Sequence, residues 1–303
     1  MNRLRLGVSS RRAAYVALVL LTLVWGFNWV VMKAALARAD PLSFNFARTW
    51  LAVLVLFAAL ALRRGRWLPH SWWAVVVTGF FQTTINFGAT MMAVATGGAG
   101  RAAVLVFTMP FWTLVIARIV LDERIRRFQV PAIALAFTGL VCIVEPWSWQ
   151  GGLAAKLWAV LSGFGWAAGT VALKRFQRDP GFDILPFIAW QMAVGAIPLA
   201  LLPWLYGAPA IEWTAGELAC LLYVGAISSA AGFIAWMEIL RWLPAGEASL
   251  NIFAIPVIAL VASMVIFGEK LAGNEWLGIA LIGAGLAMVA LWSLGATRRV
   301  IRE

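Results

Sequence analysis

The sequence is a succession of long apolar runs, and this feature restricts the fold more than any other. Each run holds about 20 mostly apolar residues, the length of an α-helix that crosses the hydrocarbon core of a bilayer. Short breaks that contain polar residues, glycine or proline separate the runs. We predict ten transmembrane helices, at residues 13–37, 44–62, 72–95, 99–121, 129–146, 155–175, 183–206, 216–240, 246–267 and 275–294.

The composition agrees with an all-α integral membrane protein. Of 303 residues, 63% are hydrophobic and 12% are charged, whereas about a quarter of an ordinary soluble domain is charged. A membrane β-barrel is excluded because barrel strands alternate in polarity over about 10 residues. We disfavour a secretory signal at residues 1–37, because the apolar run is longer than the usual core of about 7 to 15 residues.

The basic residues predict the orientation of the chain in the membrane. The formal net charge is +11, and with ten spans most Lys and Arg lie on the face that carries both chain ends. By the positive-inside rule both termini are cytoplasmic, as basic segments at residues 1–12 and 295–303. The charge is therefore an insertion signal, and we expect no nucleic-acid partner.

One segment of the chain is spelled twice. Residues 99–123 read AGRAAVLVFTMPFWTLVIARIVLDE, and residues 245–269 read AGEASLNIFAIPVIALVASMVIFGE. The two segments align without a gap at an offset of 146 residues, which carries Pro110 onto Pro256. The same register continues into the helices on either side, so we interpret the chain as a duplication.

The duplication predicts a 5+5 inverted-topology repeat. A small shift in register also aligns the first helices of the two halves, with Trp25 on Trp166. Each repeat, at residues 13–146 and 155–294, has five spans, so the second enters the membrane from the opposite side. Inverted repeats are typical of secondary transporters, which work by alternating access around a site near the midplane. We expect Glu123 at the cytoplasmic end of span four.

Polar and aromatic residues inside the spans are candidates for a substrate cavity. Polar side chains are costly in a bilayer and often functional, although hydrogen bonding between helices is an equal alternative. Tryptophans near the span centres could likewise line a cavity for aromatic substrates or pack between helices. The candidates for the cavity are Trp25, Asn28, Gln82, Thr83, Asn86, Trp112, Trp166, Ser228 and Trp236.

Two prolines and one arginine raise separate questions. Pro110 and Pro256 each remove a helical hydrogen bond in mid-span, and we predict a helix bend that could serve gating or be a passive kink. Arg48 could pair with a substrate carboxylate, but we expect its side chain to reach out to the membrane interface.

Other classes of function lack their residues. The spans have no acidic residue near their centres, so proton coupling would need another group. No nucleophile, base or metal-binding motif occurs. Cys142 and Cys220 fall inside spans, where a disulfide is not expected. We predict that the chain is no enzyme, has no cofactor and no metal, and acts as a monomer.

Several motifs resemble those of a known family. TLVWGFNWVVMKAAL, DPLSFNFARTWLAVLVL and the segment ends VLDERI and VIFGEKL resemble the two EamA-type repeats of the drug/metabolite transporter superfamily. One departure is Asp122, where the second repeat keeps the usual small residue as Gly268.

Within that superfamily the sequence is most similar to bacterial exporters of aromatic amino acids. This resemblance implies a multi-pass protein of the bacterial inner membrane that exports aromatic or other neutral amino acids through a central cavity. Two alternatives stay open. One is a multidrug exporter of lipophilic cations such as methyl viologen, and the other is a sugar-phosphate or nucleotide-sugar carrier.

Overall fold

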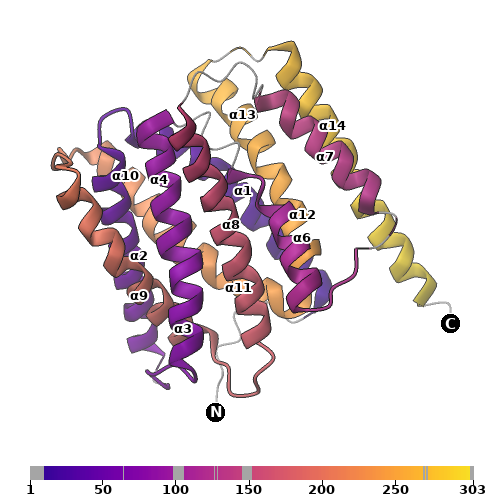
Figure 1. The fold of residues 1–303 in the computed structure, drawn as a ribbon, viewed down its shortest axis with the longest axis horizontal. Helices are drawn as coiled ribbons and strands as arrows, with labels where there is room; N and C mark the ends of the chain where they lie inside the picture. The colour runs from indigo at the N-terminus through magenta and orange to yellow at the C-terminus, as the bar shows by residue number, and fades with distance from the viewer. Residues whose placement is uncertain are drawn as a thin grey trace.

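The structure, a computed structural model, is all-helical over the residues that it describes. These are residues 10–63, 65–97, 106–125, 127, 129–144, 152–268, 270 and 272–300. The helices are α1 (Arg11–Ala35), α2 (Pro41–Leu62), α3 (Trp72–Thr78), η1 (Gly79–Ile85), α4 (Asn86–Gly97), α6 (Met109–Val120), α7 (Gln129–Val144), α8 (Leu153–Phe176), α9 (Ile184–Leu205), α10 (Ala215–Leu222), η2 (Tyr223–Ala231), α11 (Gly232–Trp242), α12 (Ala245–Leu250), η3 (Asn251–Phe253), α13 (Ala254–Phe267) and α14 (Gly273–Val300). They run side by side as a bundle (Figure 1).

Several of these elements follow one another directly, so the described residues form ten helical runs. The third predicted span is the run α3–η1–α4, the eighth is α10–η2–α11 and the ninth is α12–η3–α13. The predicted boundaries agree with the observed ones to within a few residues, except at the C-terminal helix, which extends further. Span four is described only in part, because residues 98–105 lie outside the described residues.

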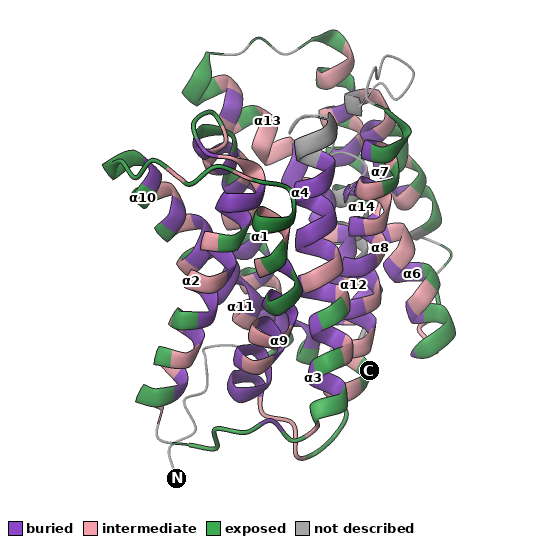
Figure 2. Cartoon of the chain, turned by 60° about the vertical axis from the view of Figure 1, so that its left-hand side comes forward, coloured by how far each residue is buried: buried purple, intermediate pink, exposed green. Residues whose placement is uncertain are grey.

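The surface of the bundle is suited to lipid. Among the described residues, five helical runs are long and apolar enough to cross a membrane: α1, α2, α9, α10–η2–α11 and α12–η3–α13. Large apolar side chains face outward along the bundle, for example Leu54, Ile119 and Val265. Figure 2 shows the buried residues on the inner faces of the helices. Apolar exposure on this scale marks a surface that water does not cover.

The starts of α2 and α9 fix how these two helices correspond. Asp40 is the N-cap of α2, where its side chain accepts hydrogen bonds from Leu42 N and Ser43 N. Asp183 is the N-cap position of α9 and pairs instead with Arg63, at 2.6 Å between Nη2 and Oδ2. The hydrogen bond to Asp183 raises the pKa of Arg63. The two caps set an offset of 143 residues (40 to 183) between these helices.

The two halves of the chain pack through corresponding helices. In chain order α1 corresponds to α8, α2 to α9, α3–η1–α4 to α10–η2–α11, α6 to α12–η3–α13, and α7 to α14. The helix α1 packs against α11 and α13, and its counterpart α8 packs against α4 and α6. Likewise η2 contacts α2, and η1 contacts α9. The packing therefore repeats the duplication seen in the sequence.

Both halves also contain the same irregular segment. The π-helical stretches η1 and η2 occupy matching places in the two halves. A Cβ atom at Gly79 would lie 2.7 Å from the carbonyl oxygen of Gln191, and one at Gly225 would lie 3.0 Å from that of Arg48. Since 79 and 225 differ by 146, both halves use a glycine at the same close helix crossing. π-Helical turns occur often at functional sites.

Each of the two predicted mid-span breaks occurs beside its proline. Pro110 lies in the first turn of α6, directly after the turn at residues 107–108, and Pro256 lies in the first turn of α13, directly after η3. A proline in the first turn of a helix sacrifices no internal hydrogen bond. The spans are therefore interrupted before the prolines rather than at them. Whether the breaks take part in gating stays a prediction.

The departure at Asp122 has a structural consequence. Asp122 has φ 61° and Gly268 has φ 67°, so both repeats end their helix with a residue in the left-handed conformation. The Glu123 N–H then bonds the Ala117 carbonyl at 3.2 Å, which ties the chain beyond Asp122 back to the last turns of α6. Glycine adopts this conformation without steric cost, but aspartate does not.

Exchanging these two residues tests the strain. We expect Asp122→Gly to raise the apparent unfolding temperature and Gly268→Asp to lower it, with the backbone effect worth about 1 kcal/mol in each. The lost ion pair from Asp122 to Arg118 offsets little, because the Asp122 side chain is 92% exposed. Thermal unfolding of the detergent-solubilised protein gives the measurement. A lower unfolding temperature for Asp122→Gly would contradict the conclusion that the left-handed conformation of Asp122 is strained.

Candidate functional site

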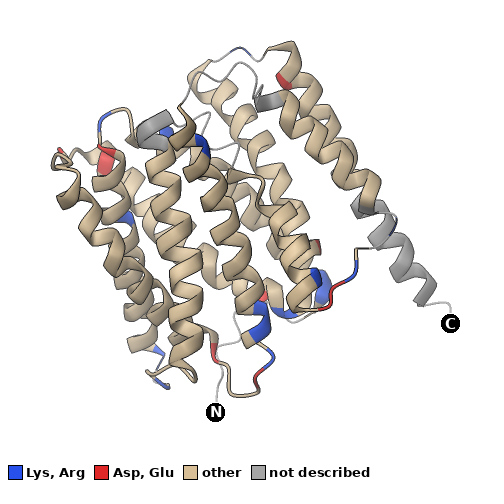
Figure 3. Cartoon of the chain, in the orientation of Figure 1, with Lys and Arg blue, Asp and Glu red and all other residues tan. Residues whose placement is uncertain are grey.

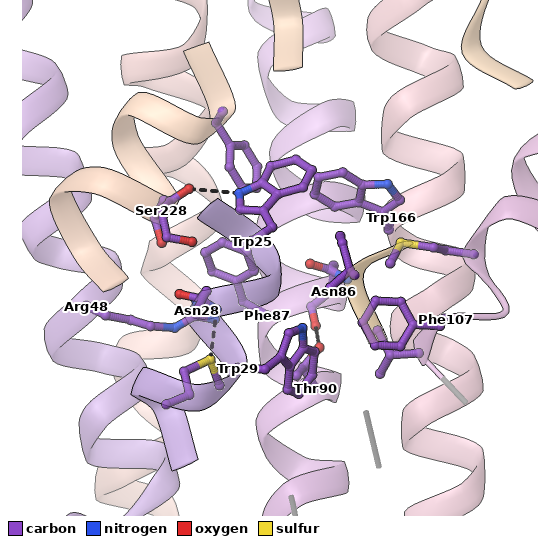
Figure 4. Close-up of a pocket in the computed structure, with 16 residues that line it drawn as sticks. Trp25, Asn28, Trp29, Arg48, Asn86, Phe87, Thr90, Phe107, Trp166 and Ser228 are labelled. Atoms are coloured by element: carbon purple, nitrogen blue, oxygen red, sulfur yellow. Dashed lines mark hydrogen bonds between the residues drawn. The ribbon is translucent and has the colours of Figure 1, made fainter. Parts of the chain in front are cut away.

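A pocket lies in the centre of the bundle, between the two halves of the chain. It encloses about 640 Å³ of empty space, including the part that opens at its mouth. Its aromatic lining is Trp25, Trp29, Phe87, Phe107, Trp166 and Phe233, and its polar lining is Asn28, Arg48, Asn86, Thr90, Ser228 and Ser229. Figure 4 shows these side chains converging from several helices.

The pocket occupies one half of the bundle's length. In α1 its lining begins at Trp25 and continues to Met32, which is the C-terminal half of that helix. In α2 the lining residue is Arg48, in the N-terminal half. These portions lie away from the end of the bundle where the described chain begins, so the pocket extends from the middle toward the opposite end.

The aromatic wall is built from residues that correspond between the two halves. The Trp25 and Trp166 rings meet edge to face, with centroids 5.2 Å apart. The Phe87 and Phe233 rings do the same at 5.5 Å, and these two residues differ by the repeat offset of 146. Equivalent residues can touch only near the axis that relates the halves. The wall of the pocket therefore lies beside that axis.

Hydrogen bonds hold this wall in place. The Trp25 indole Nε1 donates to the Ser228 carbonyl at 3.0 Å, within the π-helical segment η2. Asn86 donates from Nδ2 to Ser162 Oγ at 3.0 Å, and Thr90 Oγ1 lies 2.6 Å from the same oxygen. Asn86 and Thr90 face the pocket from α4, so this network ties one side of the pocket to α8.

Arg48 is buried in the pocket, which corrects the expectation that it reaches the membrane interface. Its side chain is 6% exposed, and Nε donates to Asn45 Oδ1 at 2.9 Å. Its guanidinium carbon lies 4.1 Å from the centre of the Phe87 ring. A cation–π contact of this kind compensates part of the cost of burying the charge.

Five of the nine candidate cavity residues line the pocket, and four do not. Trp25, Asn28, Asn86, Trp166 and Ser228 are the five in the lining. The other four are Gln82, Thr83, Trp112 and Trp236, which lie in other contacts.

Gln82 and Thr83 are fully buried between helices. Gln82 Nε2 lies 3.4 Å from Thr170 Oγ1, and Thr83 Oγ1 accepts from Gln191 Nε2 at 2.6 Å. In this conformation both residues form hydrogen bonds between helices, which was the alternative to a place in the cavity lining. Sequence could not decide this, because η1 and η2 correspond while only η2 borders open space.

The remaining two candidates are tryptophans with different surroundings. Trp236 is completely buried behind the wall, with its ring 5.7 Å from that of Trp25 and 5.6 Å from that of Trp166. Trp112 packs edge to face on Phe164 at 5.8 Å and borders a separate apolar groove between α6, α7 and α8. Trp112 therefore faces away from the central pocket.

The end of the bundle opposite the pocket is closed by polar contacts. Just after α6, Glu123 accepts hydrogen bonds from the Ala245 and Gly246 backbone N–H groups, both at 3.1 Å. These groups begin α12, where a carboxylate also complements the helix dipole. Lys174, near the end of α8, donates to the Leu243 carbonyl at 2.7 Å.

A second carboxylate completes this closure. Glu247 in α12 pairs with Arg11 at 3.0 Å and accepts a hydrogen bond from the Tyr15 hydroxyl. We call the set Arg11, Tyr15, Glu123, Lys174 and Glu247 the terminal seal. Figure 3 shows Lys and Arg positions, coloured blue, at this end of the bundle, where the described chain begins. Glu123 thus lies at the end of the bundle where the described chain begins, and the pocket is closed on that side. That this end is cytoplasmic stays a prediction.

Three pocket residues had no strong signal in the sequence. Trp29 and Phe107 are aromatic residues in spans already rich in them, and Phe233 lies one residue away from the polar pattern of span eight. Phe233 could have been found, because the repeat offset pairs it with Phe87.

The family of the chain follows from a match to a family model. The description of that model is the EamA-like transporter family, and it matches twice, at residues 12–145 and 153–291. The chain belongs to the EamA-like transporter family. It is therefore a multi-pass membrane transporter and not an enzyme. The two matches also correspond to the two halves that pack symmetrically here.

Other EamA-like proteins resemble the chain over most of its length. An uncharacterized transporter of Bacillus subtilis, YoaV, is 27% identical, with 89% of this chain and 94% of that protein covered. A probable amino-acid metabolite efflux pump of Salmonella typhimurium is 28% identical, covering 91% and 94%. A probable terminal-alkyne amino-acid exporter of Streptantibioticus cattleyicolor is 26% identical, covering 93% and 95%.

The fold is shared with a solved crystal structure. The two superpose with a TM-score of 0.78 over 96% of this chain and 99% of that one. At 20% sequence identity this similarity concerns the fold alone.

Two matched cysteine variants test which half of the bundle is open. Ser228 and Gln82 are equivalent at the repeat offset, but only Ser228 lines the pocket. With Cys142 and Cys220 replaced by alanine, we expect a membrane-impermeant thiol reagent to modify Ser228→Cys roughly tenfold faster or more than Gln82→Cys, because modification of a buried thiol requires opening. Equal rates, or faster modification of Gln82→Cys, would contradict the observed conformation.

Proposed function

We propose that this transporter exports aromatic or other neutral amino acids from a bacterial cytoplasm. The ten helical runs cross the inner membrane as a 5+5 inverted-topology repeat, with both termini in the cytoplasm. The substrate binds in the central pocket, and the two halves exchange conformations so that the pocket faces each side in turn. One chain suffices, because both halves of the pocket come from it.

The observation that carries this proposal is the position of the pocket beside the contacts between equivalent residues. Trp25 meets Trp166 and Phe87 meets Phe233 at the place where the halves are related. A site on such an axis can be exposed to either side when the halves exchange their arrangements. With cytoplasmic termini, the terminal seal closes the cytoplasmic side, and the present conformation faces outward.

The chemistry of the pocket supports amino acids as cargo. Its wall offers tryptophan and phenylalanine rings for an apolar or aromatic side chain, and its polar groups offer amide, hydroxyl and guanidinium contacts. Two of the relatives are named as a probable amino-acid metabolite efflux pump and a probable terminal-alkyne amino-acid exporter. A carrier of lipophilic cations is less well supported, because no acidic side chain of the described residues lines the pocket.

Transport in proteoliposomes tests the proposal. We expect efflux of labelled tryptophan and phenylalanine, with threonine slower and methyl viologen excluded. Trp166→Ala removes an aromatic ring from the pocket wall. A lost ring contact with the substrate, worth about 0.5–1.5 kcal/mol beyond its buried area, should raise the KM for tryptophan by up to roughly tenfold. The matched control Trp112→Ala changes a tryptophan outside the pocket and should leave transport unchanged.

The same assay, run with and without an imposed proton gradient, separates the alternatives. Transport of methyl viologen alone, accelerated by the gradient, would replace the amino-acid proposal with a cation exporter. Counterflow of sugar phosphates would favour the phosphate-carrier alternative. Equal loss of tryptophan transport in both tryptophan variants would show that the pocket is not the substrate site.

A further inference from the structure

Arg48 places a positive charge in the central pocket, where no acidic side chain of the described residues lies in the lining. Of the described residues that line the pocket, none is Asp, Glu or Lys, and Arg48 is the arginine among them. The ion pairs recorded for the described part of the chain do not include Arg48. A buried charge is costly unless it has a partner. The unpaired charge of Arg48 in the pocket therefore suits a ligand that supplies the opposite charge.

The contacts of Arg48 leave one edge of its guanidinium available. The Nε atom is engaged by Asn45 Oδ1 at 2.9 Å, and one face of the group lies over Phe87 at 4.1 Å. No acceptor among the described residues is recorded for the two terminal nitrogens. Two parallel N–H groups of this kind match the two oxygens of a carboxylate.

Two other polar groups of the pocket also lack partners within the described residues. Asn28 Oδ1 is a buried acceptor without a hydrogen bond, and Trp166 Nε1 is a buried donor without one. Asn28 and Arg48 both line the pocket (Figure 4), and Asn28 Nδ2 donates to the sulfur of Met32 at 3.2 Å. Buried polar atoms are normally paired, so unpaired ones in a pocket indicate the chemistry of its ligand.

The charge belongs to one half of the molecule only. At the offset set by the N-caps of α2 and α9, Arg48 corresponds to Gln191. Gln191 is fully buried and bonds Thr83, so it takes no part in the pocket. The two halves therefore differ at this position. Arg48 carries a positive charge in the first half, whereas the second half has the neutral Gln191, which only packs between helices.

We propose that Arg48 binds the carboxylate of the transported substrate and that Asn28 Oδ1 accepts a hydrogen bond from its ammonium group. The inference rests on the proposed function, because it assigns the substrate class of the same pocket. The ligand that fits these groups is a carboxylate with an apolar or aromatic body, and the substrate that we propose is the zwitterion of a neutral amino acid. Cations without a carboxylate are rejected by the charge on Arg48.

Competition against tryptophan transport tests this in the unmodified protein. Tryptophan and indole-3-propionate carry the carboxylate, whereas tryptophan methyl ester and tryptamine do not. We expect the first two to compete and the last two to be weaker by roughly 10- to 100-fold, as for the loss of hydrogen bonds to a charged group. Equal competition by the methyl ester would overturn the role of Arg48 and leave the proposed function standing.

Variants give the second half of the test. Arg48→Gln should raise the KM for tryptophan roughly 10- to 100-fold and abolish the preference for tryptophan over its methyl ester. Arg48→Lys keeps a positive charge and should retain part of that preference. Arg38→Gln removes an exposed charge near the same end of the bundle and should change neither. Size-exclusion profiles and unfolding temperatures show whether each variant folds. If Arg48→Gln does not fold, the competition series in the unmodified protein tests the role of the substrate carboxylate.

The two proposals fail in different ways. A preference for the free acid that persists in a folded Arg48→Gln overturns the assignment of Arg48 alone. Absence of amino-acid transport by the unmodified protein, with methyl viologen transported, overturns the proposed function and this inference together.

Discussion

The edge-to-face contact between Trp25 and Trp166 is the interaction around which the structure is organised. These residues hold equivalent places in the two repeats, and a duplicated chain can bring equivalent residues together only beside its own axis. The contact joins a side chain of α1 to one of α8 at the centre of the bundle, while α1 packs against α11 and α13 and α8 packs against α4 and α6. A bilayer requires each spanning segment to satisfy its backbone internally, so the halves join through side chains rather than through shared sheet structure.

Departures from the repeat give the bundle its asymmetry. Gln82 and Thr83 pack tightly in one half, whereas their equivalents Ser228 and Ser229 border the pocket. Glu123 and Glu247 close the end of the bundle on the packed side through α12. One sequence pattern thus adopts two local arrangements in the same molecule, which is the condition that an exchange between two states requires.

The helices and their repeat could be predicted from sequence because both rest on patterns along the chain. The length of the apolar runs predicted the spans, and the matched prolines and glutamates of the two repeats predicted the register between them. The side chains that line the pocket were harder, because Gln82 and Ser228 are equivalent in sequence and differ only in whether the neighbouring helix has closed on them. Arg48 was misplaced for another reason. An arginine near a span end usually reaches the interface, and only the tertiary contacts with Asn45 and Phe87 turn it inward.

Distances at the two ends of the bundle, measured with and without substrate, test the exchange most directly. Spin labels at Arg12 and Arg124 report on the ends of α1 and α6 beside the terminal seal, and labels at Leu153 and Lys270 report on the equivalent sites at the other end; all four are exposed. With the native cysteines replaced, alternating access predicts that tryptophan lengthens the first distance in part of the population and shortens the second in the same fraction. Changes of the same sign at both ends, or a change at one end alone, would contradict the account.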